Sequence, residues 1–156
     1  MSLLISIATL LLGSAFCSSA EAALFSISTN RVKAMKKEKV KNAKALLRVK
    51  NNISGSIGAI VILNNLFNIV GTIYAGILAS ELLGGNELYL GIFSGVLTFL
   101  VILFGEIIPK NFGERHAESY SLSIAGIIIW LTWILTPILI ILNSINHMLF
   151  GARTQA

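Results

Sequence analysis

Polar side chains inside apolar stretches are the places where this chain could do chemistry. Ser14, Ser18 and Glu21 are separated by four and then three residues, a spacing that puts them on one face of a helix. Asn64 and Asn68 repeat the four-residue spacing in a second apolar stretch. All five side chains offer oxygen, and an all-oxygen set is what hard cations such as Mg²⁺ or Ca²⁺ take. Facing helices that carry these groups could therefore bind a cation.

A third apolar stretch ends in FGEIIPKNFGER, residues 104–115, and adds a carboxylate, Glu106. Pro109 has no N–H to offer the carbonyl one turn earlier, so the carbonyl of Gly105 is expected to be free beside that carboxylate. We predict that the helix breaks at this proline. Irregular backbone at membrane depth is allowed where it lines a cavity, so the break would help to form the cation site.

Simpler interpretations exist for the same residues. Serine hydroxyls often bond to a carbonyl one turn back on their own helix, and asparagines often only join helices together. Glu106 would then be a residue at the membrane edge, paired with Lys110 four positions on. The two histidines, His116 and His147, are remote from the polar faces, so no zinc or copper site is predicted.

Nothing in the chain has the pattern of a catalytic centre. The sequence contains no aspartate and no glycine-rich phosphate loop, and no serine has a nearby histidine or lysine on its helix. We therefore predict that the protein is not an enzyme.

The elements that must position these groups are apolar and long. Hydrophobic residues make up 55% of the chain and charged residues only 12%, which excludes a soluble domain of useful size. A helix needs about 20 apolar residues to cross a bilayer. Four runs reach that length, and they predict one integral membrane domain over residues 1–156: residues 3–27, 53–79, 88–108 and 122–142.

The N-terminal run could also be a signal peptide, since small residues follow it in LLISIATLLLGSAFCSSAEAA. Only Met1 and Ser2 precede the apolar residues, and neither carries the positive charge of a signal sequence. We therefore interpret the run as a retained first transmembrane helix. Cys17 is the single cysteine, so no internal disulfide can form.

The basic residues set the expected topology. Nine of the twelve lie in residues 31–50, directly between two apolar runs, which is the pattern of a cytoplasmic segment rather than a nucleic-acid site. The N-terminus is then outside. We predict a helix that rests on anionic lipid headgroups, and a solvated topology signal without further role is an equal alternative.

The fourth run leaves its path open, because it contains Thr136-Pro137. Proline kinks or breaks a helix, so the run is either a fourth crossing or two short helices that dip in and return. Small residues in the second and third runs allow a close approach between helices, within one subunit or between two copies. They are Gly71, Ala75, Gly76, Gly91, Ser94 and Gly95.

Three motifs, SAFCSSAEAALFSIS, ILNNLFNI and FGEIIPK, occur in this order on successive runs. Together they resemble the transmembrane (DUF21) domain of the CNNM/CorC family of magnesium transporters, over essentially the whole chain. The resemblance implies an all-α membrane protein with three transmembrane helices and a broken juxtamembrane helical belt, its N-terminus outside and its C-terminus cytoplasmic. It also implies a homodimer in a bacterial or archaeal plasma membrane that exports Mg²⁺ coupled to Na⁺.

By matching motif positions, the resemblance places ion ligands at Ser14, Ser18, Asn64, Asn68, Gly105 and Glu106. One departure is Ser18-Ser19-Ala20, where the family often has serine-glycine-serine, and it makes Ser19 a candidate extra donor. The family's cytoplasmic CBS pair is not in this sequence, so no nucleotide site is predicted here. The alternative function is a membrane anchor or Mg²⁺ sensor that regulates another transporter without moving ions.

Overall fold

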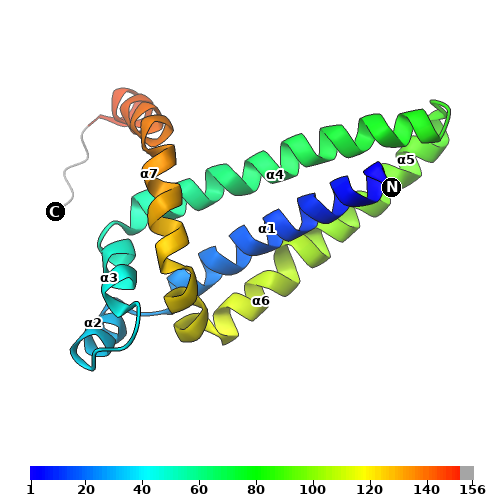
Figure 1. Ribbon diagram of the computed structural model, residues 1–156. Helices are drawn as coiled ribbons and strands as arrows, with labels where there is room; N and C mark the ends of the chain where they lie inside the picture. Colours follow the sequence, from blue (N-terminus) through cyan, green and yellow to red (C-terminus); the bar gives the residue numbers. More distant parts are fainter. Residues whose placement is uncertain (152–156) are drawn as a thin grey trace.

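Within residues 1–151, which a computed structural model describes, the chain is built from helices (Figure 1). The last five residues of the predicted domain, 152–156, lie outside this part. The described elements confirm the all-α prediction. They are α1 (Ser2–Ser26), α2 (Thr29–Lys37), α3 (Ala43–Asn51), α4 (Ile53–Leu82), α5 (Glu87–Leu100), the π-helix η1 (Val101–Ile107), α6 (Ile108–Arg115) and α7 (Ala117–Phe150).

Three long rods run alongside one another: α1, α4, and the continuous series α5, η1 and α6 (Figure 1). That series, Glu87–Arg115, forms one apolar helical stretch of 29 residues. By length and composition, 4 stretches in the described part could cross a membrane, α7 being the fourth. The protein is therefore an integral membrane protein.

The rods have two different ends. At one end, here called the hairpin end, Met1 lies near the turn between α4 and α5 (Figure 1). That turn uses Gly84 and Gly85 at φ 62° and 70°, a conformation that glycine adopts without strain. Asn86 then caps α5, since its side-chain oxygen accepts the N–H groups of Leu88 and Tyr89. The opposite end, which carries α2 and α3, is here called the basic end.

The basic segment forms two short helices rather than one. Ser28 caps α2 by accepting the N–H of Arg31, and the chain turns back around Val40, between Lys39 and Asn42 at φ 58° and 66°. Both helices are amphipathic, because their apolar side chains are buried against the bundle while most of their lysines and arginines stay exposed. The buried residues include Val32, Met35, Leu46 and Val49.

Of the two paths left open for the fourth run, the structure contradicts the two short helices that dip in and return. Helix α7 continues from Ala117 to Phe150 with Pro137 inside it. A proline within a helix removes one hydrogen bond, but membrane helices tolerate it where neighbouring groups and local adjustment compensate. The path of α7 still differs from the others, since it crosses the rods steeply at the basic end and its last part leans away (Figure 1). The length of α7 would allow it to cross a membrane, whereas its direction differs from that of the three rods.

The larger apolar core lies at the basic end, where α1, α2, α3, α4 and α7 meet. Leu24, Leu46, Ile60 and Ile128 are fully buried there. Each such side chain contributes roughly 1.5–3 kcal/mol by leaving water. A smaller cluster, Leu10 with Ala75 and Leu97, holds the rods together nearer the hairpin end. The basic end is therefore the firmer support for any site on α1.

Candidate functional site

One predicted site residue, Ser14, contacts two of the other five in the middle of the bundle. The Ser14 hydroxyl of α1 lies 3.0 Å from Oδ1 of Asn64 on α4 and 3.3 Å from the carbonyl oxygen of Gly105 on η1. Ser14 is fully buried. Its single proton is shared between two acceptors, so three oxygens from three different helices gather at one point.

Because α1 and α4 run antiparallel, Ser18 lies one turn from Ser14 toward the basic end, whereas Asn68 lies one turn from Asn64 toward the hairpin end. The hydroxyl oxygen of Ser18 and Oδ1 of Asn68 are both buried, and neither has a hydrogen-bond partner in the described part of the chain. A buried polar atom left without a partner costs about 1–3 kcal/mol and calls for an explanation such as a water or an ion. These two oxygens are therefore open positions, one on each side of the Ser14 contact.

The π-helix η1 explains how the third rod passes Pro109 without breaking. The N–H of Ile108 bonds to the carbonyl of Leu103, five residues back, and Pro109 then falls in the first turn of α6, where no N–H is needed. The predicted break at Pro109 is wrong, because the register shift happens before the proline. Single π segments are often found at functional sites.

Glycine at position 105 allows the close approach of η1 to α1. A Cβ atom there would lie 3.0 Å from the Ser14 hydroxyl oxygen, closer than nearly all real contacts. A side chain there would force the Ser14 side chain to shift. The absence of a side chain at the buried Gly105 thus brings its carbonyl within reach of Ser14.

Glu106 follows Gly105 on η1 and is half-buried. Within residues 1–151 it has no ion pair. Lys110, its expected partner in the simpler interpretation, instead lies 4.0 Å from the carboxylate of Glu21 on α1. Glu21 therefore has a lysine nearby, whereas Glu106 has no ion-pair partner in the described residues.

Ser19 points toward α7. Its hydroxyl lies 2.8 Å and 3.0 Å from the carbonyls of Ala15 and Phe16, and 2.8 Å from the hydroxyl of Tyr120. Ser19 has one proton to give, and its own helix receives it, so Tyr120 donates to Ser19. The candidate extra donor is thus already bonded within its helix and to α7.

Sequence patterns missed this contact, because Tyr120 is 101 residues away and no periodicity connects the two. The nearby Gly113 of α6 was missed as well, although its backbone packs directly against the carbonyl of Ser19. A glycine in a helix is the one signal that could have suggested such close packing.

One of the nine basic residues caps α1. The Lys50 ammonium on α3 donates to the carbonyl of Leu24 at 2.8 Å, in the last turn of α1, where carbonyls lack helical partners. Burial lowers the pKa of Lys50. This lysine therefore holds α3 to the helix that carries Ser14 and Ser18, and its role is not lipid contact alone.

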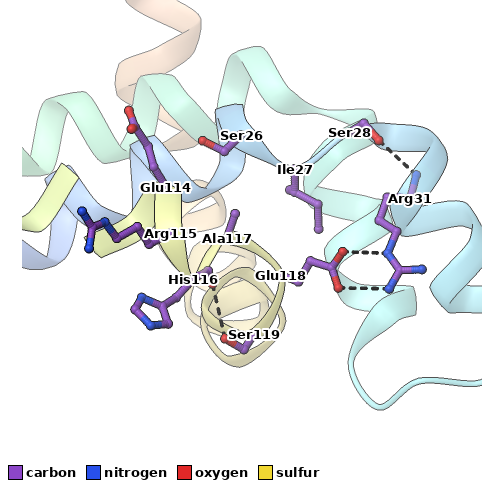
Figure 2. Close-up of a pocket in the computed structure, with 10 residues that line it drawn as sticks. All are labelled: Ser26, Ile27, Ser28, Arg31, Glu114, Arg115, His116, Ala117, Glu118 and Ser119. Atoms are coloured by element: carbon purple, nitrogen blue, oxygen red, sulfur yellow. Dashed lines mark hydrogen bonds and ion pairs between the residues drawn. The ribbon is translucent and has the colours of Figure 1, made fainter. Parts of the chain in front are cut away.

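A polar pocket of about 630 Å³ lies at the basic end, away from Ser14 (Figure 2). Arg31 and Glu118 face each other there and make two bonds of 2.7 Å and 3.1 Å. The bond to Glu118 raises the pKa of Arg31. Both groups are exposed, and exposed pairs contribute little to stability. The pocket is a surface feature where the end of α1 and the start of α2 meet the junction of α6 and α7.

Residues 1–151 contain no group of three or more His, Cys, Asp and Glu side chains that could hold a metal. A cation at the polar centre would therefore depend on hydroxyl, amide and backbone oxygens together with one carboxylate. Such a set suits a hard cation that keeps some of its water.

Long apolar helices around a buried polar centre define an all-α integral membrane protein. The model of the family described as "CNNM: Cyclin M transmembrane N-terminal domain" matches residues 4–155, and the chain belongs to this family. It is similar to the UPF0053 protein sll1254 of Synechocystis sp., with 45% identity over 137 residues. It is also similar to the UPF0053 inner membrane protein YfjD of Escherichia coli, with 28% identity over 145 residues. With bacterial relatives of this kind, the protein belongs in a bacterial plasma membrane.

The alignments cover 88% of this chain but 39% of the Synechocystis protein, and 91% of this chain but 33% of the E. coli protein. A UPF0053 protein of Haemophilus influenzae, 30% identical over 130 residues, is matched over 83% of this chain and 30% of its own length. The chain thus spans less than two-fifths of these relatives.

Proposed function

We propose that this domain carries a divalent cation, Mg²⁺, across the membrane as the transported substrate, exporting it in exchange for Na⁺. The observation that supports this best is the meeting of Asn64 and Gly105 at Ser14, with a buried, unpartnered oxygen one turn away on either side. Membership of the CNNM family is consistent with metal transport.

The proposed ligands are the side chains of Ser14, Ser18, Asn64, Asn68 and Glu106 and the carbonyl of Gly105. Mg²⁺ prefers six oxygens at about 2.0–2.1 Å and gives up its water reluctantly. Neutral oxygens would replace part of that water, and Glu106 would offset part of the charge. Because Lys110 is turned to Glu21, the Glu106 carboxylate is not already neutralised by that lysine.

We propose three membrane crossings, by α1, α4 and the α5–η1–α6 rod, with α7 as part of a juxtamembrane belt. The steep path of α7 across the basic end favours this arrangement over a fourth parallel crossing (Figure 1). The positive-inside pattern then puts the basic end and the C-terminus in the cytoplasm and the N-terminus outside. The exposed cations of α2 and α3 would rest on anionic lipid.

A homodimer is part of the proposal. A Cβ atom placed on Gly76, Gly91 or Gly95 would meet nothing within 4 Å in the same chain. These small residues of α4 and α5 therefore leave room for a second copy to approach closely. Light scattering in detergent should give the mass of two chains, and a monomer with full transport would contradict the dimer.

Ion flux separates a transporter from the alternative, a membrane anchor or Mg²⁺ sensor. Liposomes that contain only this protein and a Mg²⁺-sensitive dye should show Mg²⁺ movement that depends on a Na⁺ gradient. Protein that binds Mg²⁺ without moving it would instead favour the sensor. Mg²⁺ flux that is insensitive to Na⁺ would contradict the proposed coupling to Na⁺ but would still support Mg²⁺ transport.

A further inference from the structure

Lys110 and Glu21 form an ion pair on the basic-end side of the proposed cation site. Their nitrogen and oxygen are 4.0 Å apart, and the side chains are 48% and 26% exposed. The pair joins α1 to α6, the continuation of the helix that carries Gly105 and Glu106. Nothing in the proposed ligand set uses either residue.

Position on the helices puts this pair next to the site. Glu21 lies three residues beyond Ser18, on the face of α1 that also carries Ser14. Lys110 lies four residues beyond Glu106, about one turn along the same rod, across the change from the π-helix η1 to α6. An ion that moves between the polar centre and the basic end along this face would pass the lysine.

We propose that Lys110 sets the cation affinity of the site, by neutralising Glu21 and by repelling a bound cation. This inference rests on the proposed function and adds a residue that is not a ligand. With Lys110 in place, the region has one uncompensated carboxylate, Glu106. A transport site must bind weakly enough to release its ion, and an ammonium group near the site lowers affinity without altering any ligand.

The sign of this effect distinguishes Lys110 from a structural residue. Lys110→Gln removes the repulsion and frees the charge of Glu21, so Mg²⁺ should bind about 3- to 10-fold more tightly at low ionic strength. Glu21→Gln leaves the lysine uncompensated, so Mg²⁺ should bind more weakly by a similar factor. The double variant should return close to the wild-type affinity.

Calorimetric Mg²⁺ titration of the full chain in detergent tests this, at low and at high salt. The gain in Mg²⁺ affinity of Lys110→Gln should be smaller at high salt, because partly exposed charges are screened. Lys110→Arg keeps the charge and should bind like wild type. Arg115→Gln is the matched control, since it removes one exposed positive charge from the same helix five residues further on and should leave affinity nearly unchanged.

Unchanged or weaker binding in folded Lys110→Gln would overturn this inference while wild-type binding upheld the proposed function. A double variant as weak as Glu21→Gln would also overturn it, because Glu21 would then act as a ligand rather than as the partner of Lys110. Absence of Mg²⁺ binding to the wild-type protein would overturn the proposed function and this inference together. Melting curves of each variant confirm that it is folded.

Discussion

The basic end and the hairpin end contain similar residue types, but these residues differ in burial and in hydrogen bonding. Between Ser14 and Leu24 most of α1 is buried, whereas Leu4 and Leu12 nearer the hairpin end are each 72% exposed. Hydroxyls differ in the same way. Ser14 bonds across to other helices, while Thr9 and Thr98 bond only to carbonyls one turn back on their own helices.

Glycines make the contrast clearer. A Cβ on Gly105 or Gly113 would press against α1, while one on Gly91 or Gly95 would meet nothing within 4 Å. The first pair permits close packing inside one chain. The second pair leaves a surface for lipid or a second copy. Residue type alone therefore does not distinguish the two uses, since the distinction depends on what faces each residue.

The largest effect on stability should come from Gly113→Ala. The new methyl group would overlap the carbonyl oxygen of Ser19, which is backbone and cannot turn aside. Overpacking of this kind costs typically about 1–3 kcal/mol. Thermal unfolding in detergent should show a clearly lower melting temperature. Gly126→Ala is the control, since a Cβ on this α7 glycine would meet nothing within 4 Å and the residue is not part of the proposed dimer contact; it should hold or raise stability by up to about 1 kcal/mol.

Tyr120→Phe should have a smaller effect. It removes the hydroxyl that donates to Ser19, a contact worth about 0.5–1.5 kcal/mol. The matched variant Tyr74→Phe changes an exposed tyrosine toward the hairpin end and should leave the melting temperature unchanged. Equal shifts in both variants would mean that the contact between α1 and α7 contributes nothing.

Glu118→Gln should have the smallest effect, although it breaks the shortest ion pair in the described chain. Both partners are exposed to solvent, where water and salt screen the attraction. The melting temperature should change by little more than the error of the measurement, and the change should vanish at high salt. A large loss of stability would show that this end of α7 depends on Arg31.

Sequence patterns predicted the long helices well, because the formation of each helix depends on the composition of its own segment. The run predicted at residues 53–79 corresponds to α4 at Ile53–Leu82, and the run at 3–27 to α1 at Ser2–Ser26. The proline interpretations were less reliable. Pro109 and Pro137 both lie within continuous helical stretches, since a register shift before the first and the tolerance of long apolar helices for the second remove the need for a break.

For the polar residues, spacing predicted the arrangement within one helix but not the contacts between helices. Helical spacing correctly put Ser14 and Ser18 on one face, and the structure brings Ser14 to Asn64 and Gly105. Spacing could not predict that Lys110 pairs with Glu21 and not with Glu106. It also could not predict the hydrogen bond between Ser19 and Tyr120, because both contacts form between helices. Such contacts depend on rotation and depth, which a single sequence does not specify.

Glu106 is proposed to provide the charge of the cation site. The most direct measurement is a Mg²⁺ titration by calorimetry of Glu106→Gln beside wild type, with Glu81→Gln as a control that removes an exposed carboxylate near the hairpin end. Loss of a charged ligand is worth about 1.5–3 kcal/mol, so Glu106→Gln should bind at least about tenfold more weakly while Glu81→Gln binds normally. Wild-type affinity in a folded Glu106→Gln protein would contradict the account.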